Sequence, residues 1–121
     1  QIEIIPWTLE AEKTHLQEIH FGMMPLDEKK FDYYKCGYKL VQYLAHGKPC
    51  FAYDYGENSN IIVDGENGLL FKKIDQNRKL DMLVNIPNDK YSEMSEKAFE
   101  TYNHKYSFSL VKQKFKNATK N

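Results

Sequence analysis

Residues 35–49 read KCGYKLVQYLAHGKP, a mixed polar and apolar run that ends in glycine and proline. Its apolar side chains recur at helical spacing, which predicts an amphipathic helix over residues 35–46. Gly47 then suits the position just beyond a helix end. The next run, CFAY at residues 50–53, is short, apolar and bounded by turn residues, as buried strands are.

Strands and helices continue to alternate on both sides of this stretch. Strands are also predicted over residues 1–6, 19–24 and 69–71. Helices are predicted after Thr8, over 61–63, after Asp75, and twice in the tail, around 94–102 and 110–115. This order predicts an α/β fold, with a parallel sheet of about four strands, flanking helices and a helical C-terminal end.

Composition favours a soluble globular unit. The 121 residues suit one compact domain, and 41% of them are hydrophobic while 28% are charged. Seventeen basic residues balance seventeen acidic ones, so no overall field favours nucleic acid as a partner. No apolar run approaches the roughly 20 residues of a membrane-spanning helix and no signal peptide is visible, so we expect a cytoplasmic location.

The two cysteines, Cys36 and Cys50, lack the spacing of metal ligands. They indicate reduced thiols, although two cysteines alone leave a disulfide open. Nothing in the sequence resembles a metal cluster, so we expect neither a metal nor a cofactor.

The helix predicted over residues 35–46 carries a polar stripe opposite its apolar face. At about 100° per residue, the stripe falls within about 60° and consists of Lys35, Lys39, Gln42 and His46. Helix N-termini at the carboxyl ends of parallel strands bind phosphate, and Gly37 would let a phosphate approach the backbone. The lysines would add charge for a diphosphate, although two exposed lysines are more often a solvated helix face.

The same stretch resembles the K-x-x-E-x-x-A-x-G-x-P-V helix of retaining GT-B glycosyltransferases, family 4 in particular. The GMMPL run at residues 22–26 is similar to that family's G-I-M-P-L strand end. The run from Gly56 through IIVDGENGLLF at residues 61–71 is similar to its G-x-N-x-E-I-V-x-D-G-x-N-G-L-L element. The tail from Tyr106 looks like the closing helix that crosses back to the first domain. The resemblance covers essentially the whole chain.

The resemblance implies a Rossmann-like fold, the truncated second half of a GT-B enzyme, and a donor-binding role for several residues. Cys36, Gly37 and Tyr38 would contact donor phosphate or sugar, with Lys35 and Lys39 beside the diphosphate. Gln42 occupies the place of the acidic residue that holds the donor ribose. Asn58, Ser59 and Asn60 would lie near the donor loop, and the segment of Trp7 and Glu12 near the nucleotide base.

The sequence departs from the family pattern at three positions. Many members carry two glutamates with seven residues between them, where this chain has Tyr34 and Gln42. Asn60 also replaces a usual glutamate. A carboxylate role for Tyr34 or Gln42 is therefore excluded, although glutamine can still bind ribose.

Two functions follow as expectations. The first is the donor-binding part of a retaining, hexosyltransferase-like enzyme, which would transfer sugar from a nucleotide-sugar to a glycan or glycolipid acceptor held by a separate N-terminal domain. We expect this chain to be inactive alone, and its parent to contact the inner face of a membrane peripherally. The second is a non-catalytic nucleotide-binding or interaction module with the same fold, which the missing carboxylates favour.

The resemblance also predicts an incomplete sheet. In the parent strand order 3-2-1-4-5-6, this chain would hold strands 3, 4, 5 and 6 and lack the two between 3 and 4. A bare strand edge promotes association. We therefore expect residues 2–5 to pair directly with residues 19–24 in a four-stranded sheet, or a second chain to cover the open edge in a dimer.

Overall fold

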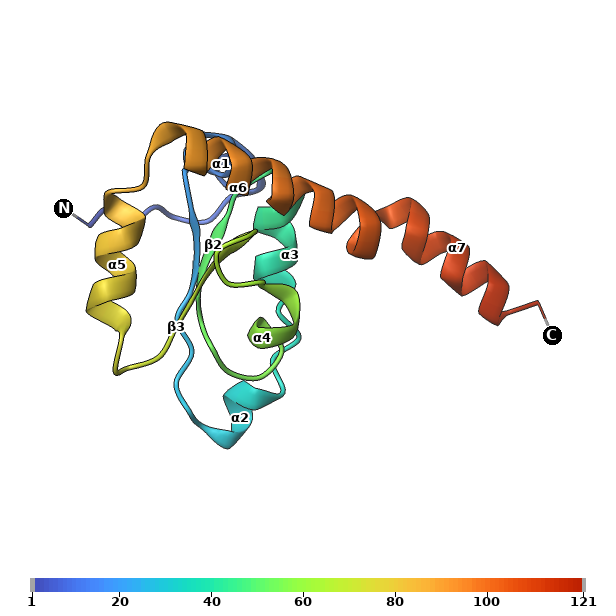
Figure 1. Ribbon diagram of the computed structural model, residues 1–121. Helices are drawn as coiled ribbons and strands as arrows, with labels where there is room; N and C mark the ends of the chain where they lie inside the picture. Colours follow the sequence, from blue (N-terminus) through green and yellow to red (C-terminus); the bar gives the residue numbers. More distant parts are fainter. Residues whose placement is uncertain (1, 121) are drawn as a thin grey trace.

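The computed structural model describes residues 2–120 and has the predicted α/β architecture (Figure 1). Three strands form its sheet: β1 (Gly22–Met24), β2 (Cys50–Tyr53) and β3 (Gly68–Phe71). The helices of the N-terminal half are α1 (Leu9–Glu18), α2 (Lys30–Tyr33), α3 (Tyr38–Ala45) and α4 (Asn58–Ile61). Those of the C-terminal half are α5 (Gln76–Val84), α6 (Asn88–Thr101), a π-helical turn η1 (Tyr102–Tyr106) and α7 (Phe108–Ala118).

The sheet is parallel, with strand order β1-β2-β3. Gly22 lies opposite Cys50, which in turn lies opposite Gly68, so the three strands begin in register. Gly22 is required because a Cβ there would come within 2.1 Å of the Tyr43 ring on α3. The carboxyl ends of the strands therefore meet at one edge of the sheet, where α2, α3 and α4 begin or end.

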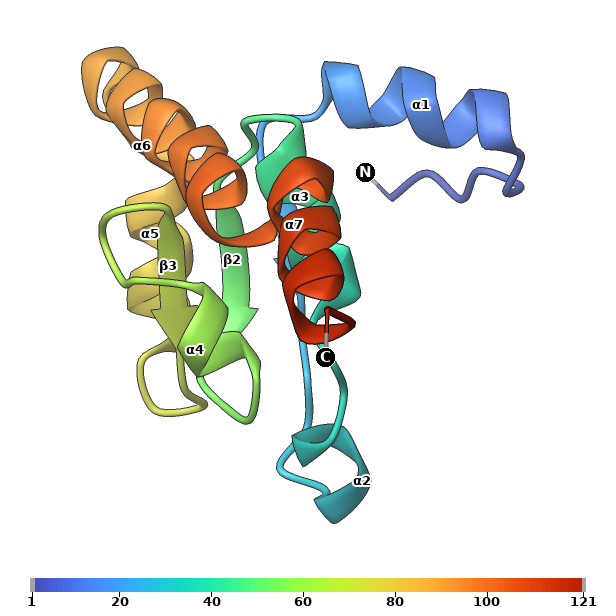
Figure 2. The ribbon, with the colours of Figure 1, turned by 90° about the vertical axis from the view of Figure 1, so that its right-hand side faces the viewer.

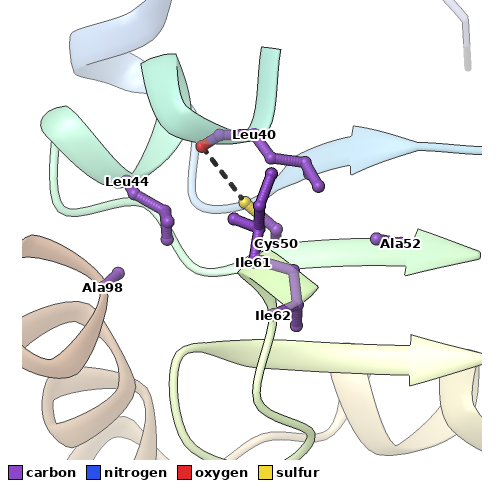
Figure 3. Close-up of a cluster of buried hydrophobic side chains, with 7 residues drawn as sticks. All are labelled: Leu40, Leu44, Cys50, Ala52, Ile61, Ile62 and Ala98. Atoms are coloured by element: carbon purple, nitrogen blue, oxygen red, sulfur yellow. Dashed lines mark hydrogen bonds between the residues drawn. The ribbon is translucent and has the colours of Figure 1, made fainter. Parts of the chain in front are cut away.

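Helices cover both faces of the sheet, with α3 and α4 on one side and α5 on the other (Figure 1). Strand β2 is buried throughout, and its successive side chains alternate between the two faces. The first core contains Cys50 and Ala52 of β2, and Figure 3 shows Leu40 and Leu44 of α3 packing toward Cys50. The second core, on the α5 side, is aromatic, and the rings of Phe51 and Phe71 stack with centroids 4.3 Å apart.

The prediction of a fourth strand is wrong over the residues that the structure describes. Residues 2–6 form no strand there and do not pair with β1; Gln1, the first residue of the predicted strand, lies outside the described part. The segment instead folds back beside α1 (Figure 2), where the Trp7 indole donates a 2.5 Å hydrogen bond to Glu12. This bond ties Trp7 to the first turn of α1, and Pro6 has no N–H to offer a neighbouring strand.

The helix predicted over residues 35–46 is shorter, because α3 begins at Tyr38. Gly37 precedes it with φ +67°, in the left-handed region, so helical geometry cannot extend back to Lys35. The short helix predicted over 61–63 lies earlier, at α4. The cap at Thr8 is confirmed, since its side chain accepts a hydrogen bond from the Ala11 amide.

Helix α7 is confirmed as a separate C-terminal helix, and it extends away from the body of the molecule (Figure 1). It contacts mainly η1, and Phe108 and Phe115 on it are exposed. Over residues 2–120, none of the helices combines the length and the apolar character needed to cross a bilayer.

Candidate functional site

The amino end of α3 opens into a hollow at the carboxyl edge of the sheet. Within the described chain, no side chain caps this helix, so the backbone N–H groups of its exposed first residues, Tyr38 and Lys39, have no side-chain acceptor. The hollow has a volume of about 390 Å³. It is lined by Met24, Phe31, Tyr34, Lys35, Cys36, Gly37, Tyr38 and Lys39. We call it the α3 hollow, and it brings together five of the residues that the sequence singled out.

Lys35 lies in the loop before α3, not on its polar stripe. Its ammonium group forms a 2.7 Å ion pair with Asp32 of α2, and this hydrogen bond lowers the pKa of the Asp32 carboxyl. The ion pair holds α2 against the loop that enters α3. Lys35 therefore borders the α3 hollow with a charge that is already partly neutralised.

A second cavity lies on the flank of α3, between that helix and α1. Its volume is about 300 Å³. The lining residues are Ile5, Pro6, Trp7, Ala11, Glu12, His15, Leu16, Ile19, Lys39, Gln42 and Tyr43. We call it the α1–α3 cavity. Lys39 lines both this cavity and the α3 hollow, and its ammonium group lies toward the cavity, beside Gln42 and Glu12.

Four polar side chains meet inside the α1–α3 cavity. Glu12 accepts hydrogen bonds from the Trp7 indole and from the Gln42 amide, and the Lys39 ammonium lies 4.0 Å from its carboxylate. These donors, the Trp7 bond foremost, lower the pKa of the Glu12 carboxyl. Lys39 also lies 3.5 Å from the Gln42 side-chain oxygen. His46, the last member of the predicted stripe, turns away and contacts the Gln42 backbone carbonyl at 2.9 Å.

Asn58, Ser59 and Asn60 lie on α4, next to the start of α3, and they serve different contacts. Asn58 is buried and donates a 3.0 Å hydrogen bond to the Tyr53 carbonyl at the end of β2. Ser59 donates to the Asp54 carboxylate at 2.6 Å, and Asn60 to the Glu57 carboxylate at 3.1 Å. None of the three lines the α3 hollow or the α1–α3 cavity.

The site therefore offers anion-binding chemistry at one end and polar recognition at the other. Backbone N–H groups at a helix start and a lysine favour a phosphate or diphosphate in the α3 hollow. A carboxylate, an amide and an indole in the α1–α3 cavity favour a ligand with hydroxyl groups and a flat ring. Among residues 2–120, no group of three or more His, Cys, Asp or Glu side chains is placed to hold a metal ion.

Sequence reasoning placed Glu12 near the site but did not foresee its bond to Gln42. The two residues are 30 positions apart, and the contact forms because Glu12 of α1 comes within hydrogen-bonding reach of Gln42 on α3. Periodicity along one helix carries no signal for such a contact. The other lining residues of the α3 hollow that the sequence did not single out for it are Met24, Phe31 and Tyr34.

Comparison with solved structures links the fold to a class of enzymes. The chain is similar to the crystal structure of TarM, a glycosyltransferase, with a TM-score of 0.54 and 27% sequence identity. The match covers 70% of this chain but only 18% of TarM, so the chain corresponds to a small part of that protein's length. No protein-family model and no curated protein matches the chain. The chain therefore has a glycosyltransferase-like fold.

Proposed function

We propose that this chain is the donor-binding part of a retaining GT-B glycosyltransferase of the family 4 type, which transfers a hexose-like sugar from a nucleotide-sugar. The likeness to TarM supports a transferase of this general kind. The observation that carries the proposal is the start of α3, where uncapped backbone N–H groups and Lys39 border one hollow. A nucleotide-sugar supplies the diphosphate that such a site favours.

The reaction would break the bond between the sugar and the diphosphate of the donor. Negative charge then develops on the departing nucleoside diphosphate, and the α3 dipole and Lys39 would stabilise it. Cys36, Gly37 and Tyr38 would contribute contacts around the phosphate and sugar. The acceptor, a glycan or glycolipid, would be held by a further domain of the parent protein, located in the cytoplasm at the inner face of the membrane.

A titration of the 121-residue chain with nucleoside diphosphates tests this proposal. We expect millimolar affinity, roughly −4 kcal/mol, because only part of the donor site is present. Lys39→Ala should remove measurable binding, while Lys112→Ala, which deletes an exposed lysine of α7, should leave it unchanged. Equal affinities of the wild-type chain and the Lys39→Ala variant would remove Lys39 from the site.

A second candidate is a nucleotide-binding module without catalysis, and residues 34 and 42 favour it because neither is acidic. The two candidates differ in turnover by the complete parent protein, which would release nucleoside diphosphate from a donor only if it is an enzyme. The isolated chain should release none under either proposal, since the acceptor would be held by a further domain.

A further inference from the structure

The α1–α3 cavity has one carboxylate among its lining residues, that of Glu12 in the first turn of α1. An ionised carboxylate offers about four acceptor positions. The Trp7 indole uses one on Oε2 and the Gln42 amide one on Oε1, which leaves one or more on each oxygen. Each of the two oxygens can therefore accept a hydrogen bond from one ligand hydroxyl. A carboxylate used in this way recognises two neighbouring hydroxyls.

The surroundings hold this carboxylate in one orientation and in its charged form. The Trp7 indole, just before α1, donates to one of its oxygens, and the Gln42 amide on α3 donates to the other. The nearby Lys39 ammonium adds an attractive charge. The same hydrogen bonds lower the pKa of the Glu12 carboxyl, so it is an acceptor at neutral pH. The Glu12 side chain is 22% exposed, so ligand hydroxyls can reach it.

The other lining residues define the rest of the ligand. Trp7 is 73% exposed, which leaves its ring available to stack against a flat heterocycle. Lys39 lies between this cavity and the α3 hollow, where backbone N–H groups favour a diphosphate. A ligand that runs from the hollow past Lys39 into the cavity thus carries phosphate first, then hydroxyls, then a ring.

We propose that Glu12 binds the ribose diol of a nucleoside diphosphate in the α1–α3 cavity, with Gln42 as the positioning residue that orients its carboxylate. This inference rests on the proposed function, because the diphosphate end is the donor's. In this inference the ribose-binding carboxylate comes from Glu12 on α1, because residue 42 is a glutamine and has none. The base lies over Trp7, and the diphosphate points toward the amino end of α3.

The test compares ribonucleoside diphosphates with their 2′,3′-dideoxy counterparts, which lack the diol, by titration of the 121-residue chain. The ADP, CDP, GDP and UDP pairs are all used because the base is not specified. For the base that binds best, we expect the ribo form to bind about tenfold more tightly, as expected for hydrogen bonds to a charged group. Glu12→Gln should lower this ratio to about one and leave the affinity of the dideoxy form unchanged.

Two further variants separate recognition from folding. Glu10→Gln makes the same change on the same turn of α1, outside the cavity, and should keep the tenfold ratio. The double variant Glu12→Gln/Gln42→Glu exchanges the two ends of the hydrogen bond and keeps a carboxylate beside Lys39. It should restore discrimination between the ribo and dideoxy forms.

The outcomes distinguish this inference from the proposed function. A ratio in Glu12→Gln that equals the wild-type ratio, or an equal loss of affinity for both forms, would overturn the role of Glu12 while nucleotide binding stands. If the folded wild-type chain bound none of the nucleotides, the proposed function would fail and this inference with it.

Discussion

At the scale of single residues, the run IIVDGENGLL at positions 61–70 has a structural role, because its side chains form hydrogen bonds within the fold. Asn67 is buried; its side-chain oxygen accepts from the Val63 amide, and its amide donates to the Ile61 carbonyl and the Thr101 hydroxyl. Asp64 accepts a hydrogen bond from the Leu70 amide and pairs with the buried Lys79 at 2.5 Å. These polar groups are satisfied inside the fold, so the run stabilises the entry to β3 and does not line the candidate site.

Asn67→Ala should lower the free energy of unfolding by about 2–4 kcal/mol, because it removes three hydrogen bonds that the buried Asn67 side chain makes. Urea denaturation measures this loss. Asn60→Ala, at an exposed position on α4, should change stability by less than about 0.5 kcal/mol. A loss of unfolding free energy in Asn67→Ala as small as that of the control would contradict the structural role of Asn67.

The two cysteines differ in accessibility, and over residues 2–120 both are free, so neither forms the disulfide that their number allowed. Cys36 is exposed, whereas burial raises the pKa of Cys50 to about 12. At pH 8 we expect one thiol to react rapidly with a disulfide reagent and the second only after denaturation. Cys36→Ser should remove the rapid phase. Rapid reaction of both thiols in the folded chain would contradict the buried position of Cys50.

Cys50 also makes stability depend on pH in the alkaline range. Its folded pKa lies above the ordinary value of 9.0, so its contribution is present below pH 9 and is lost as the pH rises toward 12. A Cys50→Ala variant lacks this titration. The difference in unfolding free energy between wild type and variant should therefore shrink above pH 9. A difference that stays constant from pH 7 to 11 would contradict this contribution.

At the scale of elements, α3 shows how far a sequence pattern can carry a prediction. The apolar face was predicted correctly, since Leu40 and Leu44 are fully buried against the sheet. The start of α3 was predicted wrongly. Helical periodicity in the sequence continues back to Lys35, but Gly37 adopts a left-handed conformation that ends the helix there. Propensity along one segment cannot reveal that α4 packs against the preceding loop. A Cβ at Gly37 would come within 2.3 Å of the Ile61 side chain on α4.

Gly37→Ala tests this account of where α3 begins. It should destabilise the chain by more than about 1–2 kcal/mol, the usual cost of a left-handed alanine, because Ile61 must also move. Gly65→Ala is the matched control, since Gly65 has φ +83° but its Cβ would meet nothing within 4 Å. Thermal or urea unfolding measures both. Equal losses in the two variants would show that packing against Ile61 does not limit the start of the helix.

The strand predicted over residues 1–6 does not form over residues 2–6, for a related physical reason. A β-branched run is compatible with a strand, but a strand forms only where a partner offers hydrogen bonds. Here Pro6 has no N–H to offer a neighbouring strand, and the Trp7 indole bonds to Glu12 on α1. The sequence could predict the composition of the site around α3, because those residues are neighbours along the chain. It could not predict the Glu12–Gln42 contact, which depends on how two helices pack.

At the scale of the whole molecule, apolar surface is exposed in regions far apart in the chain. Ile2 and Ile4 are more than nine-tenths exposed, Met23 on β1 is half exposed, and Phe108 and Phe115 project from α7. The outer edge of β1 has no strand partner among residues 2–120. Such surfaces favour association, so a dimer through the β1 edge stays a prediction.

Sedimentation at increasing concentration tests this dimer. Met23→Lys places a charge on the edge strand and should shift the chain toward monomer, whereas Met82→Lys, at a similarly exposed site on α5, should not. A chain that remains monomeric at concentrations on the order of 1 mM would contradict the dimer. Equal shifts in the two variants would place the contact elsewhere.

The start of α3 and the flank of that helix form the proposed nucleoside-diphosphate site. The most direct measurement is the location of backbone amide shifts when the ¹⁵N-labelled chain is titrated with a nucleoside diphosphate and observed by NMR. We expect the shifts to gather at residues 35–42 and around Trp7 and Glu12, and to disappear in Lys39→Ala. Shifts that gather around the exposed lysines of α7, or a spectrum that does not change, would contradict this proposal.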